Sequence, residues 1–236
     1  KILNLHTSDP VKSDFTFNNE RRPAYKLGIY NFSGVMKWFK IQPPDTDAIK
    51  WPKKYEVYIQ AHAIDRLYER IDCVDKRHVM LCVFHSMINP NIIYENGRML
   101  IAYEFSPGTA LGYFIADVTE GKLLIRTFLF ITNEGTPEAR KLKEISGMSK
   151  LDVKYWNIDK LHLFLNSDIV LKPEVKKIFT DAGCEGLFKL TLAGDGLYGG
   201  SVPLADNLLK YIGKNNDPAV EQEQTETSAG LGNENE

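Results

Sequence analysis

The 236-residue sequence is poor in cysteine and has no long hydrophobic run. Its three cysteines, Cys73, Cys82 and Cys184, are odd in number and do not form a disulfide framework. This favours a reducing compartment, so we expect a cytoplasmic location. No stretch approaches the roughly 18 apolar residues that a membrane-spanning helix needs, so no membrane association is expected. The first residues, KILNLHTSDP, also lack the hydrophobic core of a secretory signal.

The chain also lacks a strong excess of either charge. Its formal net charge is −2, with 43% hydrophobic and 25% charged residues, values that exclude wholesale disorder and a coiled coil. Six of the 31 acidic residues lie in residues 217–236, which contain no Lys or Arg, so the remainder is mildly basic, with 29 Lys and Arg against 25 Asp and Glu. Such a charge permits nucleic-acid binding without requiring it. Residues 214–236 have almost no large apolar side chain, which predicts a disordered acidic tail.

Several chemical motifs are missing as well. The sequence contains no GxxxxGK[ST] and no HExxH motif, and the glycine-rich segment 194–199 lacks the following strand and acid that a dinucleotide site requires. Cys73, His78, Cys82 and His85 are zinc-type ligands, but ligands on a single helix cannot surround a metal tetrahedrally. We therefore predict neither a metal site nor a cofactor.

The clearest pattern of structure lies between residues 55 and 132. Alternation of apolar and polar residues predicts strands, apolar residues at helical spacing predict helices, and turn-like segments (SPGT and TEGK) separate the last three strands. Asp72 is the expected cap of the second helix. The expected elements are strands at 55–59, 98–105, 111–118 and 122–132 and helices at 61–71 and 75–88.

The flanking segments complete the predicted organisation. Residues 1–50 form an N-terminal extension, residues 51–135 an α+β core domain, and residues 136–213 a mostly helical extension. Thr136 and Pro137 are a suitable cap and first residue for the first helix of that extension. The predicted fold class is α+β, with a small antiparallel sheet packed on N-terminal helices and a helical C-terminal extension.

One polar stripe on the 61–71 helix is a candidate functional site. His62, Arg66 and Arg70 are spaced by four residues and share one helix face, which Glu69 borders. Arginines bind phosphate oxygens in bidentate fashion, and imidazole exchanges protons near neutral pH. The alternative is a solvated helix face whose charges form local ion pairs.

The residues His62-Ala63, Arg66 and Glu69-Arg70-Ile71, followed at a distance by Thr127-Phe128, carry a resemblance. Residues 55–132 resemble small bacterial domains of unknown function that carry an HAxxRxxER helix. Those domains are grouped with the barnase–EndoU–colicin–RelE superfamily of ribonuclease toxins. The resemblance covers about a third of the chain and does not include the flanking segments.

The resemblance implies a metal-independent endoribonuclease or an RNA-binding domain of toxin-like type. It implies RNA as a ligand and a protein partner or antitoxin. His62, Arg66 and Arg70 would be the catalytic residues, with Arg126 and Thr127 as secondary candidates. Only one of those two can face the helix, because neighbouring strand residues point to opposite faces. The alternative is a non-catalytic interaction or regulatory protein on the same fold.

Overall fold

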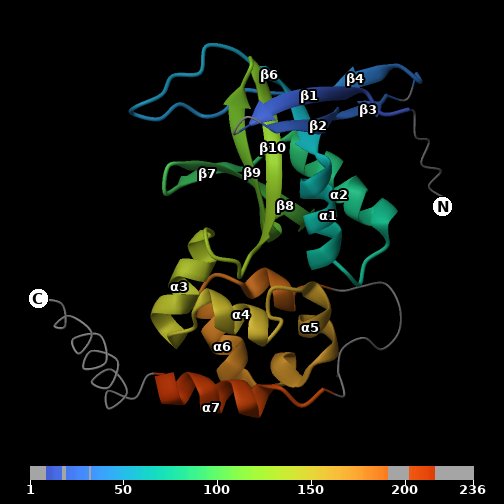
Figure 1. Ribbon diagram of the computed structural model, residues 1–236. Coiled ribbons are helices and arrows are strands. Elements are labelled where there is room, and N and C mark those ends of the chain that lie inside the picture. The colour runs from blue at the N-terminus through green and yellow to red at the C-terminus, as the bar shows by residue number, and fades with distance from the viewer. Residues whose placement is uncertain (1–8, 18–19, 32, 191–201, 216–236) are drawn as a thin grey trace, which may run out of the picture.

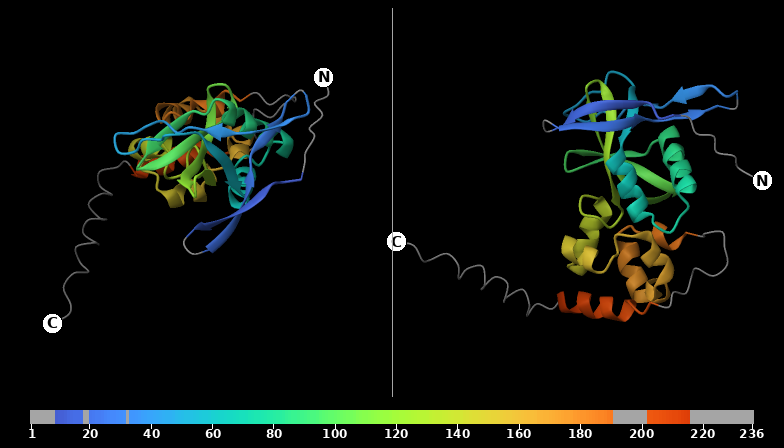
Figure 2. Two further views of the ribbon diagram at one scale, coloured as in Figure 1. Left: turned by 90° about the horizontal axis from the view of Figure 1, so that it is seen from above. Right: turned by 45° about the vertical axis from the view of Figure 1, so that its right-hand side comes forward.

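The protein consists of a β-sheet with two helices against one face and a group of short helices beyond the ends of its strands (Figure 1). This computed structural model describes residues 9–17, 20–31, 33–190 and 202–215. The right-hand view in Figure 2 also shows the helical group beyond the ends of the strands. The predicted α+β class is confirmed.

Eight strands form the main sheet, in the order β1-β2-β6-β10-β9-β8-β7, with β5 paired to β6. The predicted strands near 55–59, 98–105, 111–118 and 122–132 are confirmed as β6, β8, β9 and β10. The main-sheet strands are β1 (Lys12–Phe17), β2 (Glu20–Lys26), β5 (Lys40–Ile41), β6 (Tyr55–Gln60), β7 (Ile92–Glu95), β8 (Arg98–Ser106), β9 (Thr109–Thr119) and β10 (Lys122–Phe130). A separate hairpin joins β3 (Gly28–Tyr30) to β4 (Met36–Trp38).

The sheet is larger than expected and it is mixed, which corrects the prediction of a small antiparallel sheet. Strands β1 and β2, from the predicted N-terminal extension, continue the sheet beyond β6. Strand β6 pairs in parallel with β10 through Leu123–Ile125. Two helices and the strands β7 to β9 lie between β6 and β10 in the chain, a crossover long enough to make a parallel pair. Alternation of apolar and polar residues identifies a strand, but it does not indicate which other strand will pair with it.

Helices α1 (Ala61–Arg70) and α2 (Lys76–Ile88) confirm the two predicted helices of the core domain. Helix α1 buries Ala63 and Leu67 and leaves its polar stripe outside the core. The predicted cap of α2 is wrong: Asp75, not Asp72, accepts the Arg77 backbone N–H at 2.9 Å. Asp72 lies three residues too early to reach that turn, and it instead accepts a hydrogen bond from the backbone N–H of His162.

The helices beyond the sheet are short and pack on one another. Thr136 caps the first by accepting the Ala139 N–H at 3.1 Å, with Pro137 at its first position, as predicted. Ser149 and Asp152 form a reciprocal capping box at the second. The elements are α3 (Pro137–Ser146), α4 (Lys150–Tyr155), α5 (Leu161–Asn166), η1 (Asp168–Leu171), α6 (Pro173–Asp181), η2 (Glu185–Phe188) and α7 (Ala205–Asn215).

A single apolar cluster connects the sheet to this helical group. It contains Leu67 of α1, Ile125 and Phe128 of β10, and Phe164 and Phe179 of the helical group, none more than 2% exposed. A continuous core of this kind holds both parts in one arrangement, because separating them would expose apolar surface to water.

Some sequence predictions fall outside the described residues. They include the glycine-rich segment 194–199 and residues 216–236 of the predicted acidic tail. Of the three cysteines, which are all free, Cys82 and Cys184 are buried. No helix in the described part of the chain is both long and apolar enough to cross a membrane.

A substitution at Gly112 in β9 can test how closely β9 packs against β10. A Cβ atom at this position would lie 2.2 Å from the Leu129 carbonyl oxygen and 2.6 Å from Cζ of Phe128. We expect Gly112→Ala to destabilise the fold by about 1–3 kcal/mol or more, because the strand backbone must move. Urea unfolding measures the change.

Gly213 in α7 supplies the matched control, since a Cβ there meets nothing within 4 Å. Gly213→Ala should leave stability unchanged or raise it by up to about 1 kcal/mol, the difference in helix propensity. Equal unfolding midpoints for the two variants would contradict the packing of β9 against β10.

Candidate functional site

The polar stripe of α1 lies beside the later half of β10. Helix α1 begins directly after β6 at Ala61, and β6 stays paired with β10 only as far as Ile125. Beyond that point β10 continues to Phe130, paired with β9 on its other edge. Helix α1 therefore lies beside the later half of β10, where β6 is no longer paired with it. The polar stripe of α1 faces the space between β10 and the helical group.

This space is a cavity of about 270 Å³ that brings together four of the five predicted site residues. They are His62, Arg66 and Arg70 from α1 and Thr127 from β10. The helical group supplies the other wall, with Lys150 and Lys154 of α4, and Asn133 and Glu134 come from the loop after β10. We call this cavity the His62 pocket.

Arg126 and Thr127 are neighbours in β10, but their side chains lie in different surroundings. The register of β10 against β9 shifts between Ile125 and Thr127, so Arg126 occupies an irregularity in the ladder. Its guanidinium forms an ion pair with Asp117 of β9, and it does not line the His62 pocket. Thr127 does line it, so of these two predicted residues only Thr127 lies at the pocket.

His62 and Arg66 occupy the open end of the stripe. His62 is exposed, so its imidazole is accessible from solvent. Arg66 donates to Glu69 at 2.6 Å, and both side chains are about two-fifths exposed, at 42% and 41%. Burial opposes the charge on Glu69, but the hydrogen bond from Arg66 and the charge of Arg70 hold the pKa of this carboxyl below its usual range. Glu69 therefore stays charged and partly neutralises Arg66.

Arg70 occupies the closed end of the stripe. Its side chain is 11% exposed, and its guanidinium forms a hydrogen-bonded ion pair with the carboxylate of Asp159, which is 3% exposed. It also donates to the Asp159 carbonyl at 3.5 Å. Because Asp159 belongs to the helical group, Arg70 ties α1 to that group and has little freedom to rearrange around a ligand.

The lysines of α4 contribute charge that the sequence analysis did not anticipate. Lys150 pairs with Glu134 at 3.2 Å, whereas Lys154 has no carboxylate partner among the described residues. Lys150 and Lys154 are spaced by four, which places them on one face of α4. That spacing is visible in the sequence, but nothing local indicates that this face lies opposite His62.

The pocket has the chemistry of an anion site with a proton-transfer group. Arg66 and Lys154 can meet phosphate oxygens, Thr127 offers a hydroxyl donor, and His62 can accept or donate a proton. The carboxylates of Glu69, Glu134 and Asp159 keep the net charge only slightly positive.

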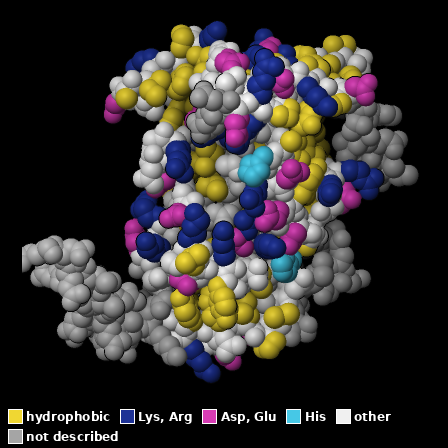
Figure 3. Space-filling view, in the orientation of Figure 1, with side chains coloured by type: hydrophobic (Ala, Val, Ile, Leu, Met, Phe, Trp, Pro, Cys, Tyr) yellow, Lys and Arg dark blue, Asp and Glu magenta, His cyan; other side chains and the backbone are white. Residues whose placement is uncertain are grey.

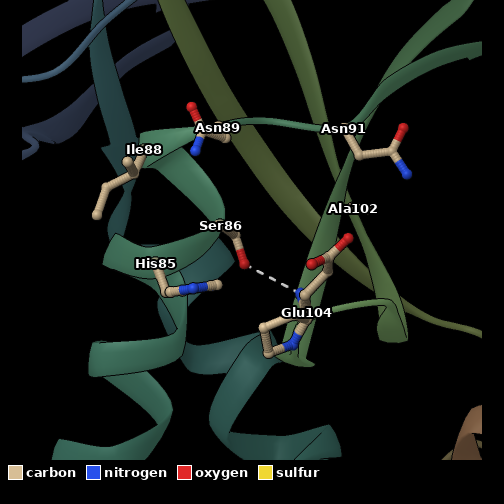
Figure 4. A pocket seen from close by; sticks show the side chains of 8 residues that line it. His85, Ser86, Ile88, Asn89, Asn91, Ala102 and Glu104 are labelled. Carbon is tan, nitrogen blue, oxygen red and sulfur yellow. Dashed lines mark hydrogen bonds between the residues drawn. The ribbon is translucent and has the colours of Figure 1, made fainter.

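A second cavity, of about 340 Å³, lies between the end of α2 and β8 (Figure 4). His85, Ser86 and Glu104 line it. The Ser86 hydroxyl donates to the Cys82 carbonyl at 2.8 Å and accepts the Glu104 N–H at 3.0 Å, so it holds the helix to the strand and is not poised as a nucleophile. We assign no chemistry to this cavity.

The zinc-type residues of the sequence do not gather into a metal site. Within the residues that the structure describes, no group of three or more His, Cys, Asp or Glu side chains could hold a metal ion. Partial burial and the charge of Asp72 raise the pKa of the Cys73 thiol to about 11, which keeps it protonated at neutral pH.

Comparison with known proteins adds no assignment: no protein-family model, curated protein or solved structure matches the chain.

The two arginines of the stripe should differ sharply in their effect on stability. Arg70→Ala leaves the buried Asp159 carboxylate without its cation and should cost about 3–5 kcal/mol. Arg66→Ala removes an exposed pair and should cost less than about 1 kcal/mol. Chemical denaturation of both variants at neutral pH measures the difference.

The double variant Arg70→Met, Asp159→Leu checks the cause. Removing both charges together should recover much of the loss, because no unpaired charge is then buried. A small effect of Arg70→Ala alone would contradict the role of Arg70 as a tie between α1 and the helical group.

Proposed function

We propose that the protein is a metal-independent endoribonuclease or RNA-binding domain of toxin-like type, acting at the His62 pocket. The observation that supports this most is the meeting of His62, Arg66, Arg70 and Thr127 around one cavity. Those residues come from two elements separated by more than fifty positions in the chain, and they are the residues that the resemblance to HAxxRxxER domains implies. A purely solvated helix face would have no reason to meet Thr127.

The proposed reaction is transesterification at a ribose. A base takes the proton of the 2′-hydroxyl, whose oxygen attacks the adjacent phosphorus, and an acid protonates the departing 5′-oxygen. The bond from phosphorus to the 5′-oxygen breaks as the cyclic phosphodiester forms, so no oxidant or reductant is needed. His62 would serve as base or acid. Glu134, the one carboxylate that lines the pocket, is the complementary candidate.

The cations and the hydroxyl have separate roles in this scheme. Negative charge develops on the non-bridging oxygens of the phosphorane, and fixed donors stabilise it best when they need not reorganise. Arg66 and Lys154 are placed to approach those oxygens, and the Thr127 hydroxyl is a further donor. Arg70, held by Asp159, would position α1 and add charge at a distance.

The alternative is a non-catalytic interaction or regulatory protein on the same fold. A specific observation favours it: Arg66 and Arg70 both already have carboxylate partners. A ligand would have to compete with Glu69 for Arg66. In this alternative the stripe serves to join α1 to the helical group.

The deciding experiment measures cleavage of labelled total RNA by the full chain, with and without EDTA. We expect cleavage that EDTA does not reduce and that His62→Ala lowers by about 10²–10⁴-fold, as for the loss of a general acid or base. The matched control is His85→Ala, another exposed histidine that does not line the His62 pocket. It should keep full activity.

Thermal melts of the same variants separate catalysis from stability. Because His62 is exposed, His62→Ala should change the free energy of unfolding by no more than about 0.5 kcal/mol. Absence of cleavage and of RNA binding in the wild type would refute the proposal and favour the non-catalytic alternative. Cleavage that EDTA abolishes would refute metal independence.

A further inference from the structure

A third cavity adjoins the His62 pocket at the junction between the sheet and the helical group. This cavity, of about 210 Å³, shares Glu134, Lys150 and Val153 with the His62 pocket. Its far end is lined by Arg140 and Lys143 of α3. The two cavities adjoin at these residues, and we call the pair of them the junction groove. Figure 3 shows Lys and Arg side chains, interspersed with Asp and Glu, gathered across the middle of this face.

Charges along the junction groove are not all equally available. Near the middle, Lys150 is paired with Glu134, and at the far end Arg140 pairs with Glu95 at 3.0 Å. Two lysines differ from these: Lys143, in the third cavity, and Lys154, in the His62 pocket, have no ion pair within the described parts of the chain. Each cavity thus has one lysine without an ion pair, and the Lys150–Glu134 pair lines both cavities.

Two available cations in successive cavities suit a ligand with repeated negative charges. A single phosphate group would be satisfied within the His62 pocket and would gain nothing from Lys143. A polynucleotide backbone places phosphates at regular intervals, and basic grooves that follow such a backbone bind single strands without requiring a particular sequence. Since each cavity is only a few hundred Å³, the groove admits a strand and not the body of a duplex.

We propose that the junction groove binds single-stranded RNA several nucleotides long, with one phosphate at His62 and Lys154 and a neighbouring phosphate at Lys143. This inference rests on the proposed function and specifies its substrate class. The Lys150–Glu134 pair, which lines both cavities, then lies beside both phosphate positions. The helical group, through α3 and α4, supplies both unpaired cations.

The test uses binding of unstructured RNA to the full chain in the His62→Ala background, so that cleavage does not interfere. A 12-nucleotide strand and a trinucleotide are compared across a range of salt concentrations. Each phosphate neutralised on a single strand contributes about 0.7 to the slope of log affinity against log salt. Adding Lys143→Ala should lower that slope by about 0.7 for the 12-mer, a loss of about fivefold in affinity at 0.1 M salt.

The same change should leave trinucleotide binding within twofold, because the short strand occupies only the His62 pocket. Lys154→Ala should weaken the binding of both the trinucleotide and the 12-mer. The matched control is Lys141→Ala, which removes an exposed charge from the same helix, α3, outside both cavities. It should alter neither slope.

The outcomes separate this inference from the proposed function. Two results would overturn the proposal that RNA binds along the junction groove. One is a salt slope for the 12-mer that Lys143→Ala leaves unchanged, and the other is duplex RNA that binds as tightly as the single strand. The proposed function survives either result if His62→Ala still abolishes cleavage by the otherwise native chain. Failure of every RNA to bind or to be cleaved refutes the proposed function and this inference with it.

Discussion

The ion pair between Arg70 and Asp159 is the constraint on which the candidate site depends. It joins the last turn of α1 to the helical group, with the Arg70 side chain 11% exposed and Asp159 3% exposed. Taking two charges out of water is costly, so such a pair contributes little net stability, yet it strongly disfavours any arrangement that separates the partners. It therefore specifies how α1 faces the helical group. The lysines of α4 lie opposite His62 only in that arrangement.

The three residues of the stripe thus differ in role although their spacing is regular. Exposure falls along the helix, from the exposed His62 through the partly exposed Arg66 to Arg70, whose side chain is 11% exposed. A residue held by a buried carboxylate is suited to positioning, whereas an exposed imidazole is free to exchange protons. The same helix face therefore carries a structural contact at Arg70 and a surface open to ligands at His62. The structural interpretation of the stripe applies to its Arg70 end, and only the His62 end is open to a ligand.

Local patterns in the sequence predict much of the fold but little of the assembly. Alternation identified β6 and β8 to β10, helical spacing identified α1 and α2, and Thr136 with Pro137 marked the start of α3. Strand order was not predictable in the same way, because the parallel pairing of β6 with β10 depends on contacts across more than sixty residues. The same limit explains the candidate site. His62, Arg66 and Thr127 were recognised by motif, whereas Lys150, Lys154 and Asp159 meet them only through tertiary packing.

The helical group changes what the resemblance to small HAxxRxxER domains implies. Residues 136–213 lie outside that resemblance, and an addition of this size could have covered the stripe. It covers only the Arg70 end and leaves His62 exposed. At the same time it supplies Lys150 and Lys154 as one wall of the His62 pocket. Without that wall, the stripe of α1 and the edge of β10 would form an open surface, where water screens each charge. The positive charge at this pocket therefore comes from both parts of the protein and not from α1 alone.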